Sequence, residues 1–309
     1  MVEVNCPLCG ENRPEPLFQA RDRLGLAKGE FSLVGCASCG MVYVNPRPGE
    51  DELAGYYPKT YWGERQAGVR ELFRGVEERL KEGYKLRAVR RAGLAGGKIL
   101  DVGCGRGEFL YLLKTRGFEV TGLEPGAEAA GRGREELGLD IINGTLGGVE
   151  LPVSAFDAAT MWHVLEHLPE PLAALRELYA ALKPGGVLLV ALPDFGSRQA
   201  EIFRERWFGI DAPRHLAHFT RAKLSEMLKR AGFRPVAFYP GGARYETAML
   251  VRSLFPALNE KKLRALGSGS PLKYVYKAAQ LALDAALLPA GLLLDGARGS
   301  TFTAAARKV

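Results

Sequence analysis

The segment ILDVGCGRGEFL, residues 99–110, constrains the fold of this chain more than any other. Its apolar start predicts a strand, and Gly103, Gly105 and Gly107 predict a tight turn that leads into a helix. Glycine is needed where the backbone turns with positive φ or comes close to a ligand. A carboxylate, Asp101, stands at the mouth of this turn, where it repels a phosphate and attracts a cation.

The spacing of the glycines narrows the ligand further. It is GxGxG rather than the GxGxxG of dinucleotide sites, and the chain has no GxxxxGK[ST] motif for a nucleoside triphosphate. A second carboxylate, Glu124, ends the next expected strand, FEVTGLEP, about twenty residues past the turn, where it can accept hydrogen bonds from ribose hydroxyls. A cofactor with an ammonium, a sulfonium, a ribose and no phosphate fits both carboxylates: S-adenosylmethionine.

From Gly97 through Val190 the chain resembles the class I S-adenosylmethionine-dependent methyltransferases, with a further match at PRHLAHFT. The segments SAFDAATMWHVLEHLPEP and LKPGGVLLVALPD resemble the family's fourth strand with its catalytic-side loop and its fifth strand. The resemblance implies an α/β fold with a doubly wound, mostly parallel seven-stranded sheet. It also suggests that the last strand runs antiparallel at one edge.

The alternation of apolar and helical segments agrees with such a sheet. A helix is expected over 70–91, before the first strand. The other expected helices lie at 107–116, 127–137, 170–182 and 220–231. The expected strands lie at 98–102, 118–123, 140–143, 156–162, 186–192, 234–239 and 300–307.

The resemblance also implies where the cofactor lies. Many relatives carry an acidic residue after the third strand for the adenine amino group, but this chain has Asn143, Gly144 and Thr145 there. We therefore expect the adenine contact to come from backbone or from Thr145. The expected cofactor-binding residues are Asp101, Gly103, Cys104, Gly105, Gly107, Glu124, Pro125, Thr145, Leu146, Trp162 and His163.

Four of the five cysteines form two matched CxxC motifs, CPLCG and CASCG. The glycine after each motif lets backbone amides turn toward the sulfurs, so Cys6, Cys9, Cys36 and Cys39 predict a structural zinc ribbon. Disulfides or a redox CxxC are the alternatives. The segment is too short to build a core of its own, so metal binding is expected to supply most of its folding energy, on the order of 10 kcal/mol. Cys104, the fifth cysteine, is expected to be a small buried filler rather than a nucleophile.

These features predict three parts: a zinc ribbon at 1–45, an aromatic-rich linker at 46–68 and a methyltransferase domain at 69–309. Residues 244–296 form a helical insertion before the last strand, which could cover the active site, form a homodimer face or lie on a membrane surface. Packing on the protein itself is the default expectation. The aromatic residues of the linker either dock the ribbon or cover the cofactor and touch substrate; they are Tyr56, Tyr57, Tyr61 and Trp62.

The four histidines fall in two clusters, and both are expected near the carboxyl edge of the sheet. Imidazole is the side chain best suited to accept a proton near neutral pH. His167 and His215 are the first choices for a general base, with Glu166 as an orienting carboxylate. His163 lines the cofactor pocket in the alternative interpretation, and His218 caps the helix after Thr220. A catalytic metal held by Glu166, His167 and a loop histidine is a further alternative.

Composition bears on location and partners. The fractions of 47% hydrophobic and 25% charged residues are typical of a globular protein, and no leader peptide is visible, so a cytoplasmic location is expected. The longest apolar run near the C-terminus, Ala285 to Leu294, is shorter than the roughly 20 residues of a transmembrane helix. The net charge of +7 permits a nucleic-acid partner without requiring one. Basic and acidic residues balance within the ribbon, which argues against a nucleic-acid reader.

The sequence therefore predicts methyl transfer from S-adenosylmethionine to a small molecule, such as a sugar nucleotide, a glycan precursor or a natural product. The combination of a zinc ribbon with a methyltransferase domain resembles the layout of enzymes that act on such small molecules. Two alternatives remain: an RNA or protein methyltransferase that uses the ribbon for recognition, and a cofactor-binding protein without catalysis.

Overall fold

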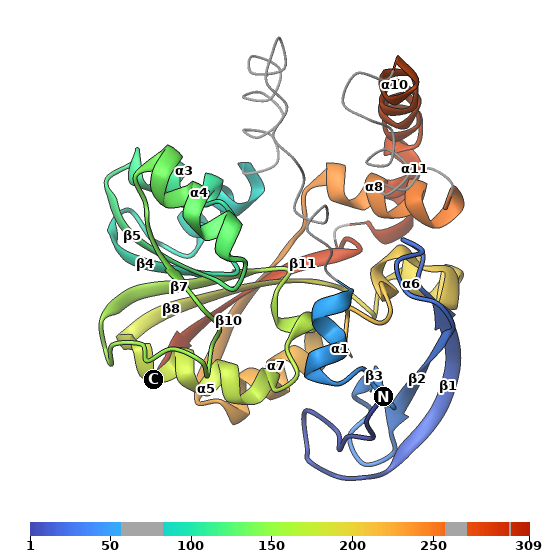
Figure 1. Cartoon of the computed structure of the whole chain (residues 1–309), viewed down its shortest axis with the longest axis horizontal. Helices are drawn as coiled ribbons and strands as arrows, with labels where there is room; N and C mark the ends of the chain where they lie inside the picture. Colours follow the sequence, from blue (N-terminus) through green and yellow to red (C-terminus); the bar gives the residue numbers. More distant parts are fainter. Residues whose placement is uncertain (57–82, 257–270, 297) are drawn as a thin grey trace. The chain divides into compact units, whose positions relative to one another are not determined.

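The computed structural model describes residues 1–56, 83–256, 271–296 and 298–309 (Figure 1). Tyr57, Tyr61, Trp62 and the first part of the helix expected over 70–91 lie outside these residues, whereas residues 83–91 are helical. The chain divides into two compact units, and each is described by itself. One unit comprises Met1–Arg65, Pro193–Lys223 and Pro240–Phe302; the other comprises Gln66–Leu192, Leu224–Tyr239 and Thr303–Val309.

The second unit is built on a seven-stranded sheet with the order β10-β11-β8-β7-β4-β5-β6 (Figure 1). The strand pairs β4/β5, β4/β7, β5/β6 and β7/β8 are parallel. The strands are β4 (Gly97–Val102), β5 (Phe118–Glu124), β6 (Asp140–Asn143), β7 (Phe156–Trp162), β8 (Leu182–Pro193), β10 (Phe233–Pro240) and β11 (Thr301–Lys308). The expected mostly parallel, doubly wound sheet is confirmed.

Helices follow the strands as the sequence predicts. They are α3 (Glu108–Lys114), α4 (Ala127–Leu137), α5 (Pro171–Ala181) and α7 (Arg221–Arg230). A buried cluster of Leu110, Ala130, Leu139 and Ile141 joins α3 and α4 to the sheet beside β6. The helix α4 approaches closely because Gly133 has no side chain: a Cβ there would lie 2.3 Å from Ile141 Cδ1. Close packing of this kind fixes α3 and α4 against the part of the sheet that contains β6.

The last strand differs from its expected place at an edge. It lies between β8 and β10, so β10 is the edge strand. Its direction is antiparallel to β8, since Lys308 Nζ donates to the Leu182 carbonyl (2.8 Å) at one end and Asp194 N donates to the Ser300 carbonyl (2.8 Å) at the other. The physical reason is burial: the first six residues of β11 are buried, as in an interior strand, whereas only the first residue of β10 is buried, and β10 contains prolines, which suit edges.

The first unit contains a four-stranded sheet with the order β1-β2-β3-β9, in which every pair is antiparallel. Its strands are β1 (Pro14–Arg21), β2 (Glu30–Cys36), β3 (Val42–Val44) and β9 (Ala217–His218). Its α-helices are α1 (Glu50–Gly55), α6 (Arg198–Phe203), α8 (Ala243–Leu254), α10 (Pro271–Ala286) and α11 (Leu288–Asp295). The helical stretch expected over 244–296 is thus seen as α8, α10 and α11 within the described residues.

The ribbon strands share a hydrophobic core with later parts of the same unit. Phe31, Leu33 and Val44 pack in one buried cluster with Trp207 and Met249. The ribbon therefore has a source of folding energy other than a metal, in the core that it shares with later segments. Burying one large apolar side chain contributes roughly 1.5–3 kcal/mol, so this core adds substantially to any contribution from a metal.

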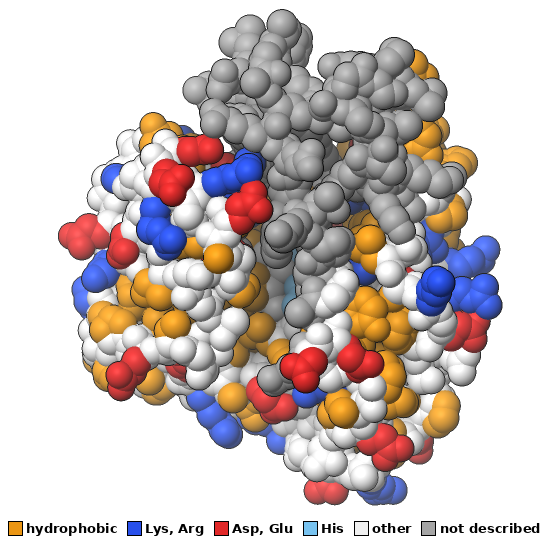
Figure 2. All heavy atoms as spheres, in the orientation of Figure 1, with side chains coloured by type: hydrophobic (Ala, Val, Ile, Leu, Met, Phe, Trp, Pro, Cys, Tyr) orange, Lys and Arg blue, Asp and Glu red, His pale blue; other side chains and the backbone are white. Residues whose placement is uncertain are grey.

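Two surface properties bear on partners. No helix in the described part of the chain is both long enough and apolar enough to cross a bilayer. On the described surface of the face drawn in Figure 2, acidic and basic side chains are intermixed.

Candidate functional site

The glycine turn after β4 has the backbone that the sequence predicts. Gly103, Gly105 and Gly107 have φ of 68°, 59° and 81°, in the left-handed region that favours glycine. The turn is closed by hydrogen bonds from Gly103 N to the Leu123 carbonyl (2.7 Å) and from Gly107 N to the Cys104 carbonyl (3.0 Å). Hydrogen bonds therefore close the turn and attach it to the end of β5.

The three glycines have different surroundings. A Cβ at Gly103 would lie 2.6 Å from Val164 Cγ2, and one at Gly107 would lie 2.4 Å from Leu139 Cδ1. These two positions need glycine for packing as well as for φ. At Gly105 no atom of the described residues lies within 4 Å of such a Cβ. The middle of the turn is therefore the part that leaves space for a ligand.

Glu124, at the end of β5, is fully buried and bound to this turn. Its Oε2 accepts a hydrogen bond from Gly105 N (2.8 Å), and its Oε1 accepts one from Gly126 N (2.8 Å). Burial raises the pKa of this carboxyl, and the two amide hydrogen bonds oppose that rise. A carboxylate has about four acceptor positions, so two remain after these two bonds. A ribose diol supplies the matching number of donors.

Asp101 and Cys104 lie on either side of the start of the turn. Asp101 is buried and accepts a hydrogen bond from the Thr160 hydroxyl. Burial raises the pKa of the Cys104 thiol, and the carboxylates of Asp101 and Glu124 raise it further. The thiol thus stays neutral, which fits a filler and not a nucleophile. A Cβ at Gly122 would lie 2.6 Å from Cys104 Sγ, so the thiol fills space beside β5.

The loop after β6 is bound to the end of β5. Asn143 Nδ2 donates to the carbonyls of Glu124 (2.9 Å) and Pro125 (3.0 Å), and Gly144 N donates to the Glu124 carbonyl (3.0 Å). Asn143 therefore has a local structural role. In the same loop, Thr145 is exposed and Leu146 is partly buried.

Trp162 ends β7 within an aromatic group that the sequence analysis did not recognise. Its ring packs edge-on against Tyr84 and Phe109, with centroid separations of 5.7 and 5.3 Å. The ammonium of Lys85 lies 5.7 Å from the centroid of Trp162. Trp162 Nε1 is buried, and it has no hydrogen-bond partner among the residues that the structure describes. The only sequence signal for this group was the position of Phe109 directly after the turn.

The histidine cluster after β7 is partly buried. His163 has a φ of 57°, uncommon for a residue with a side chain, and its amide donates to the Ala191 carbonyl (3.0 Å). Its Nδ1 lies 3.5 Å from Oε1 of the buried Glu166. His167 is in the short 3₁₀-helix η2 (Leu165–His167) and is partly exposed. The structure thus brings His163, Glu166 and His167 together in the second unit.

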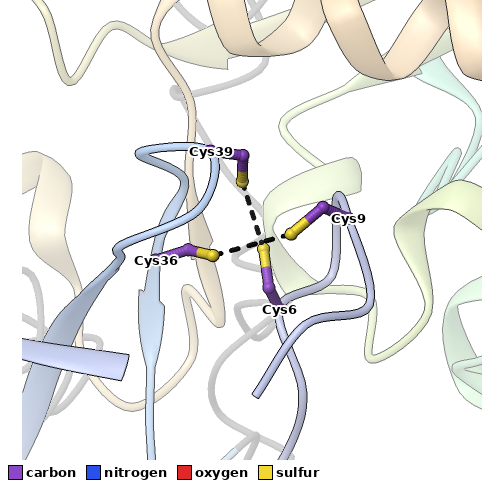
Figure 3. Close-up of side chains that lie close together, drawn as sticks. All are labelled: Cys6, Cys9, Cys36 and Cys39. Carbon is purple, nitrogen blue, oxygen red and sulfur yellow. Dashed lines mark hydrogen bonds between the residues drawn. The ribbon is translucent and has the colours of Figure 1, made fainter. Parts of the chain in front are cut away.

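The four predicted sulfur ligands converge in the first unit (Figure 3). Cys6 and Cys39 have their Sγ atoms 3.5 Å apart, as do Cys9 and Cys36, and all four sulfurs lie within 4.8 Å of one another. A tetrahedral zinc with Zn–S distances of about 2.3 Å requires sulfurs roughly 3.8 Å apart, so the cluster fits this metal. None of the five cysteines forms a disulfide. The cluster is therefore compatible with the predicted zinc ribbon.

The backbone of both knuckles turns as expected, but the thiols differ: burial raises the pKa of Cys6 and Cys39, whereas the pKa of Cys36 is lowered. Gly10 and Gly40 have φ of 80° and 72°, and their amides donate to the carbonyls of Cys6 (2.9 Å) and Cys36 (2.7 Å). Burial raises the pKa of the Cys36 thiol, but hydrogen bonds from the amides of Cys39 and Ser38 outweigh it and lower the pKa to about 7. Backbone donors of this kind stabilise metal-bound sulfur.

The other histidine cluster lies in the first unit. Nδ1 of His215 is 2.8 Å from the Gly209 carbonyl. Because a carbonyl only accepts, Nδ1 of the neutral ring carries the proton and Nε2 is the basic nitrogen. His218 is buried in β9, where it pairs with Val42 of β3. The suggested cap on α7 is supplied instead by Thr220, whose hydroxyl accepts from Lys223 N (3.2 Å).

Comparison with known proteins identifies the family. The model of the family described as "Methyltransferase domain" matches residues 69–237, more than half of the chain. A ubiquinone biosynthesis O-methyltransferase of Psychrobacter cryohalolentis is 36% identical over 130 residues, which are 38% of this chain and 49% of that protein. The corresponding enzyme of Pseudomonas aeruginosa is 35% identical over 108 residues, which are 33% and 46% of the two chains. The chain thus spans about half the length of these curated relatives.

A solved structure agrees with the fold. The crystal structure described as a sarcosine dimethylglycine methyltransferase from Galdieria sulphuraria has a TM-score of 0.54 and 16% identity, and the match covers 84% of this chain and 98% of that one. At this identity the match shows the fold alone. The strand order and the parallel pairs agree with the class I methyltransferase fold that the sequence resembles. The chain belongs to the methyltransferase-domain family.

Proposed function

We propose that this protein transfers the methyl group of S-adenosylmethionine to a small-molecule acceptor. The observation that carries the cofactor assignment is the buried Glu124 carboxylate, held by the Gly105 amide at the end of β5. It has two acceptor positions left beside the one glycine of the turn that leaves space. An anionic cofactor is disfavoured here, because Asp101 and Glu124 both lie at this turn.

In this proposal, different residues contact different chemical groups of the cofactor. Glu124 accepts from the ribose hydroxyls, and Asp101 with the turn of Gly103, Gly105 and Gly107 lies at the amino end of the methionine part. The segment of Pro125, Thr145 and Leu146 contacts the adenine, and Trp162 and His163 line the pocket at the end of β7. When bound, this cofactor supplies a methyl group that its sulfonium has already activated.

The enzyme then needs chiefly to align the acceptor and to take up its proton. Alignment supplies much of the rate, and a general base adds roughly 10²- to 10⁴-fold where the nucleophile is a hydroxyl. We assign the base to His167 or His215. The geometry of His215 suits this role because Gly209 holds the proton on Nδ1 and leaves Nε2 to accept one. Glu166 would orient the ring of His163.

A small acceptor is supported by two observations. The relatives above are named as O-methyltransferases of ubiquinone biosynthesis, which points to a hydroxyl on a small molecule. The face in Figure 2 mixes acidic and basic side chains over its described surface, unlike the basic stripe of a nucleic-acid reader. In this proposal the ribbon at 1–45 holds one structural zinc through Cys6, Cys9, Cys36 and Cys39.

The test is a transfer assay with a labelled methyl donor. Sugar nucleotides and phenolic small molecules are screened beside RNA and protein fractions, with the Glu124→Ala variant as the control for cofactor-dependent labelling. Label on a small molecule with the wild type alone supports the proposal. Label on RNA or protein, with none on the small molecules, contradicts it.

A further inference from the structure

A fully buried arginine, Arg214, lies beside the proposed base in the sequence and is unexplained by cofactor or zinc binding. Its guanidinium contacts two carboxylates of the first unit. Its Nη2 lies 2.6 Å from Asp22 Oδ1 and 2.5 Å from Asp211 Oδ1, and its Nε lies 3.0 Å from Asp211 Oδ2. A buried charge is stable only when it is paired and hydrogen-bonded in this way.

Asp22 anchors this cluster to the turn that follows β1. Its carboxylate accepts hydrogen bonds from the amides of Leu24 (2.8 Å), Leu26 (2.5 Å) and Ala27 (2.7 Å). One end of the guanidinium is therefore held by a hydrogen-bonded turn far away in the sequence. Arg214 thus connects that turn to the loop that carries the histidines.

Asp211 connects the cluster to His215. Its carbonyl accepts from His215 N (3.1 Å), and its Oδ2 lies 3.9 Å from His215 Nε2. Asp211 has a φ of 36°, which a residue with a side chain adopts at a cost of about 1 kcal/mol or more unless its surroundings hold it. The bidentate contact with Arg214 stabilises Asp211 in this conformation. The position of the His215 ring on the Gly209 carbonyl depends on the same short loop.

We propose that Arg214 is a positioning residue for His215: by fixing Asp211 against Asp22, it keeps Nδ1 of His215 on the Gly209 carbonyl and so makes Nε2 the proton acceptor. This inference rests on the proposed function for the role of His215 as the base. The positioning itself does not depend on catalysis. Arg214 touches neither substrate nor cofactor in this proposal.

Two variants test whether the planar guanidinium of Arg214 is needed to hold the two aspartates. Arg214→Lys keeps the charge but replaces a planar fork with a single ammonium, which does not bridge two aspartates in the same way. Asp22→Asn weakens the contact between Asp22 and Arg214 from the turn after β1, and it changes no residue of the loop that carries His215. Both variants are expected to shift His215 in the same direction, and the double variant is expected to be no worse than the more affected single one.

The first measurement is the ¹⁵N spectrum of the histidine side chains, assigned with a His215→Gln variant. In the wild type we expect His215 as the Nδ1–H tautomer, and in Arg214→Lys we expect the Nε2–H tautomer to become populated. The second is the rate with an acceptor from the screen. We expect kcat to fall about 10- to 100-fold while KM for S-adenosylmethionine stays unchanged, since a small misplacement of a catalytic group has effects of that size.

Leu33→Ala is the matched control, because Leu33 is in the core of the same unit and its truncation lowers stability without removing a hydrogen bond among Asp22, Arg214 and Asp211. It should keep the His215 tautomer and kcat at temperatures well below unfolding. An unchanged tautomer in Arg214→Lys would overturn the positioning role. Full activity of His215→Gln would instead overturn the base assignment, and the spectrum would still decide whether Arg214 positions the ring.

Discussion

Gly105 N donates to Glu124 Oε2 over 2.8 Å, which joins the glycine turn after β4 to the carboxylate that ends β5. The contact requires positive φ at residue 105 and burial of the carboxylate, and the structure has both. The two halves of the proposed cofactor site therefore fix each other. Such preorganisation lowers the entropic cost of binding.

Replacement of Glu124 tests the site most directly. Glu124→Gln keeps the shape but removes the charge, and one of its terminal groups donates where the carboxylate accepts. Two hydrogen bonds to a charged group contribute about 1.5–3 kcal/mol each, so we expect affinity for S-adenosylmethionine to fall at least about 100-fold. Isothermal titration calorimetry measures the affinity of each variant for S-adenosylmethionine. Glu128→Gln, a change at an exposed position on α4, is the control, and equal affinity in both variants would remove Glu124 from the site.

A comparison of two glycine variants distinguishes the effect of backbone strain on stability from the effect of an added methyl group on cofactor binding. Gly105 and Gly117 both have positive φ, and neither has a described atom within 4 Å of an added Cβ. Alanine at either position should therefore destabilise the fold by about 1–2 kcal/mol. Only Gly105→Ala should also weaken cofactor binding, because its methyl group enters the space beside Glu124. Thermal unfolding and calorimetry of the two variants test this, and parallel losses of affinity would contradict it.

The zinc prediction concerns metal content and stability together. Elemental analysis of protein purified without added metal should find one zinc per chain, and Cys9→Ser should lose it and unfold at a lower temperature. Cys104→Ser is the matched control, since Cys104 is outside the sulfur cluster and should leave the zinc bound. Absence of zinc from wild-type protein with five titratable thiols would rule out the metal site.

The sheet of the second unit and its glycine turn were predictable from sequence because each signal was local. The glycine turn, Asp101 and Glu124 lie at strand ends, and a parallel sheet brings such ends together. The place of β11 was missed, although TFTAAA contains no charged residue, as is typical of a strand that is buried on both faces. That pattern, read alone, indicates an interior strand.

The first unit was less predictable because it is assembled from distant segments. The core shared by Phe31, Trp207 and Met249, and the link from Asp22 to Arg214, join residues far apart in the chain. No periodicity marks such contacts in one sequence. The arginine in APRHLAHFT was the available signal, since a charge within an otherwise apolar and histidine-rich segment requires a partner if it is buried.

The Asp22–Arg214 pair predicts a dependence of stability on pH. Burial raises the pKa of Asp22, but the hydrogen bonds and charge of Arg214 outweigh it and hold the pKa below its ordinary value. A lowered folded-state pKa stabilises the protein above the unfolded-state pKa of about 3.9, and this contribution is lost as pH falls through the folded-state value. Breaking a buried pair costs about 3–5 kcal/mol, so Asp22→Asn should be less stable by that order at pH 7.

The measurement is the free energy of unfolding in urea between pH 7 and pH 3. The difference between wild type and Asp22→Asn should narrow as the pH falls below about 4. Asp51→Asn, at an exposed position in α1, should show a small difference that does not change with pH. A gap for Asp22→Asn that is constant over this range would show that the carboxylate charge is not what stabilises the pair.

The assignment of the base predicts a specific split between rate and affinity. If His215 or His167 accepts the proton, its replacement by alanine should lower kcat by about 10²-fold or more while affinity for S-adenosylmethionine stays nearly constant. The reason is that a base acts on the acceptor in the transition state and has little part in holding the cofactor. Single-turnover rates and calorimetry on each variant measure the two quantities, and His218→Ala serves as a buried-histidine control for structural effects. Equal losses of rate and affinity would place the residue in the pocket wall, and full activity in both variants would mean that alignment alone drives the reaction.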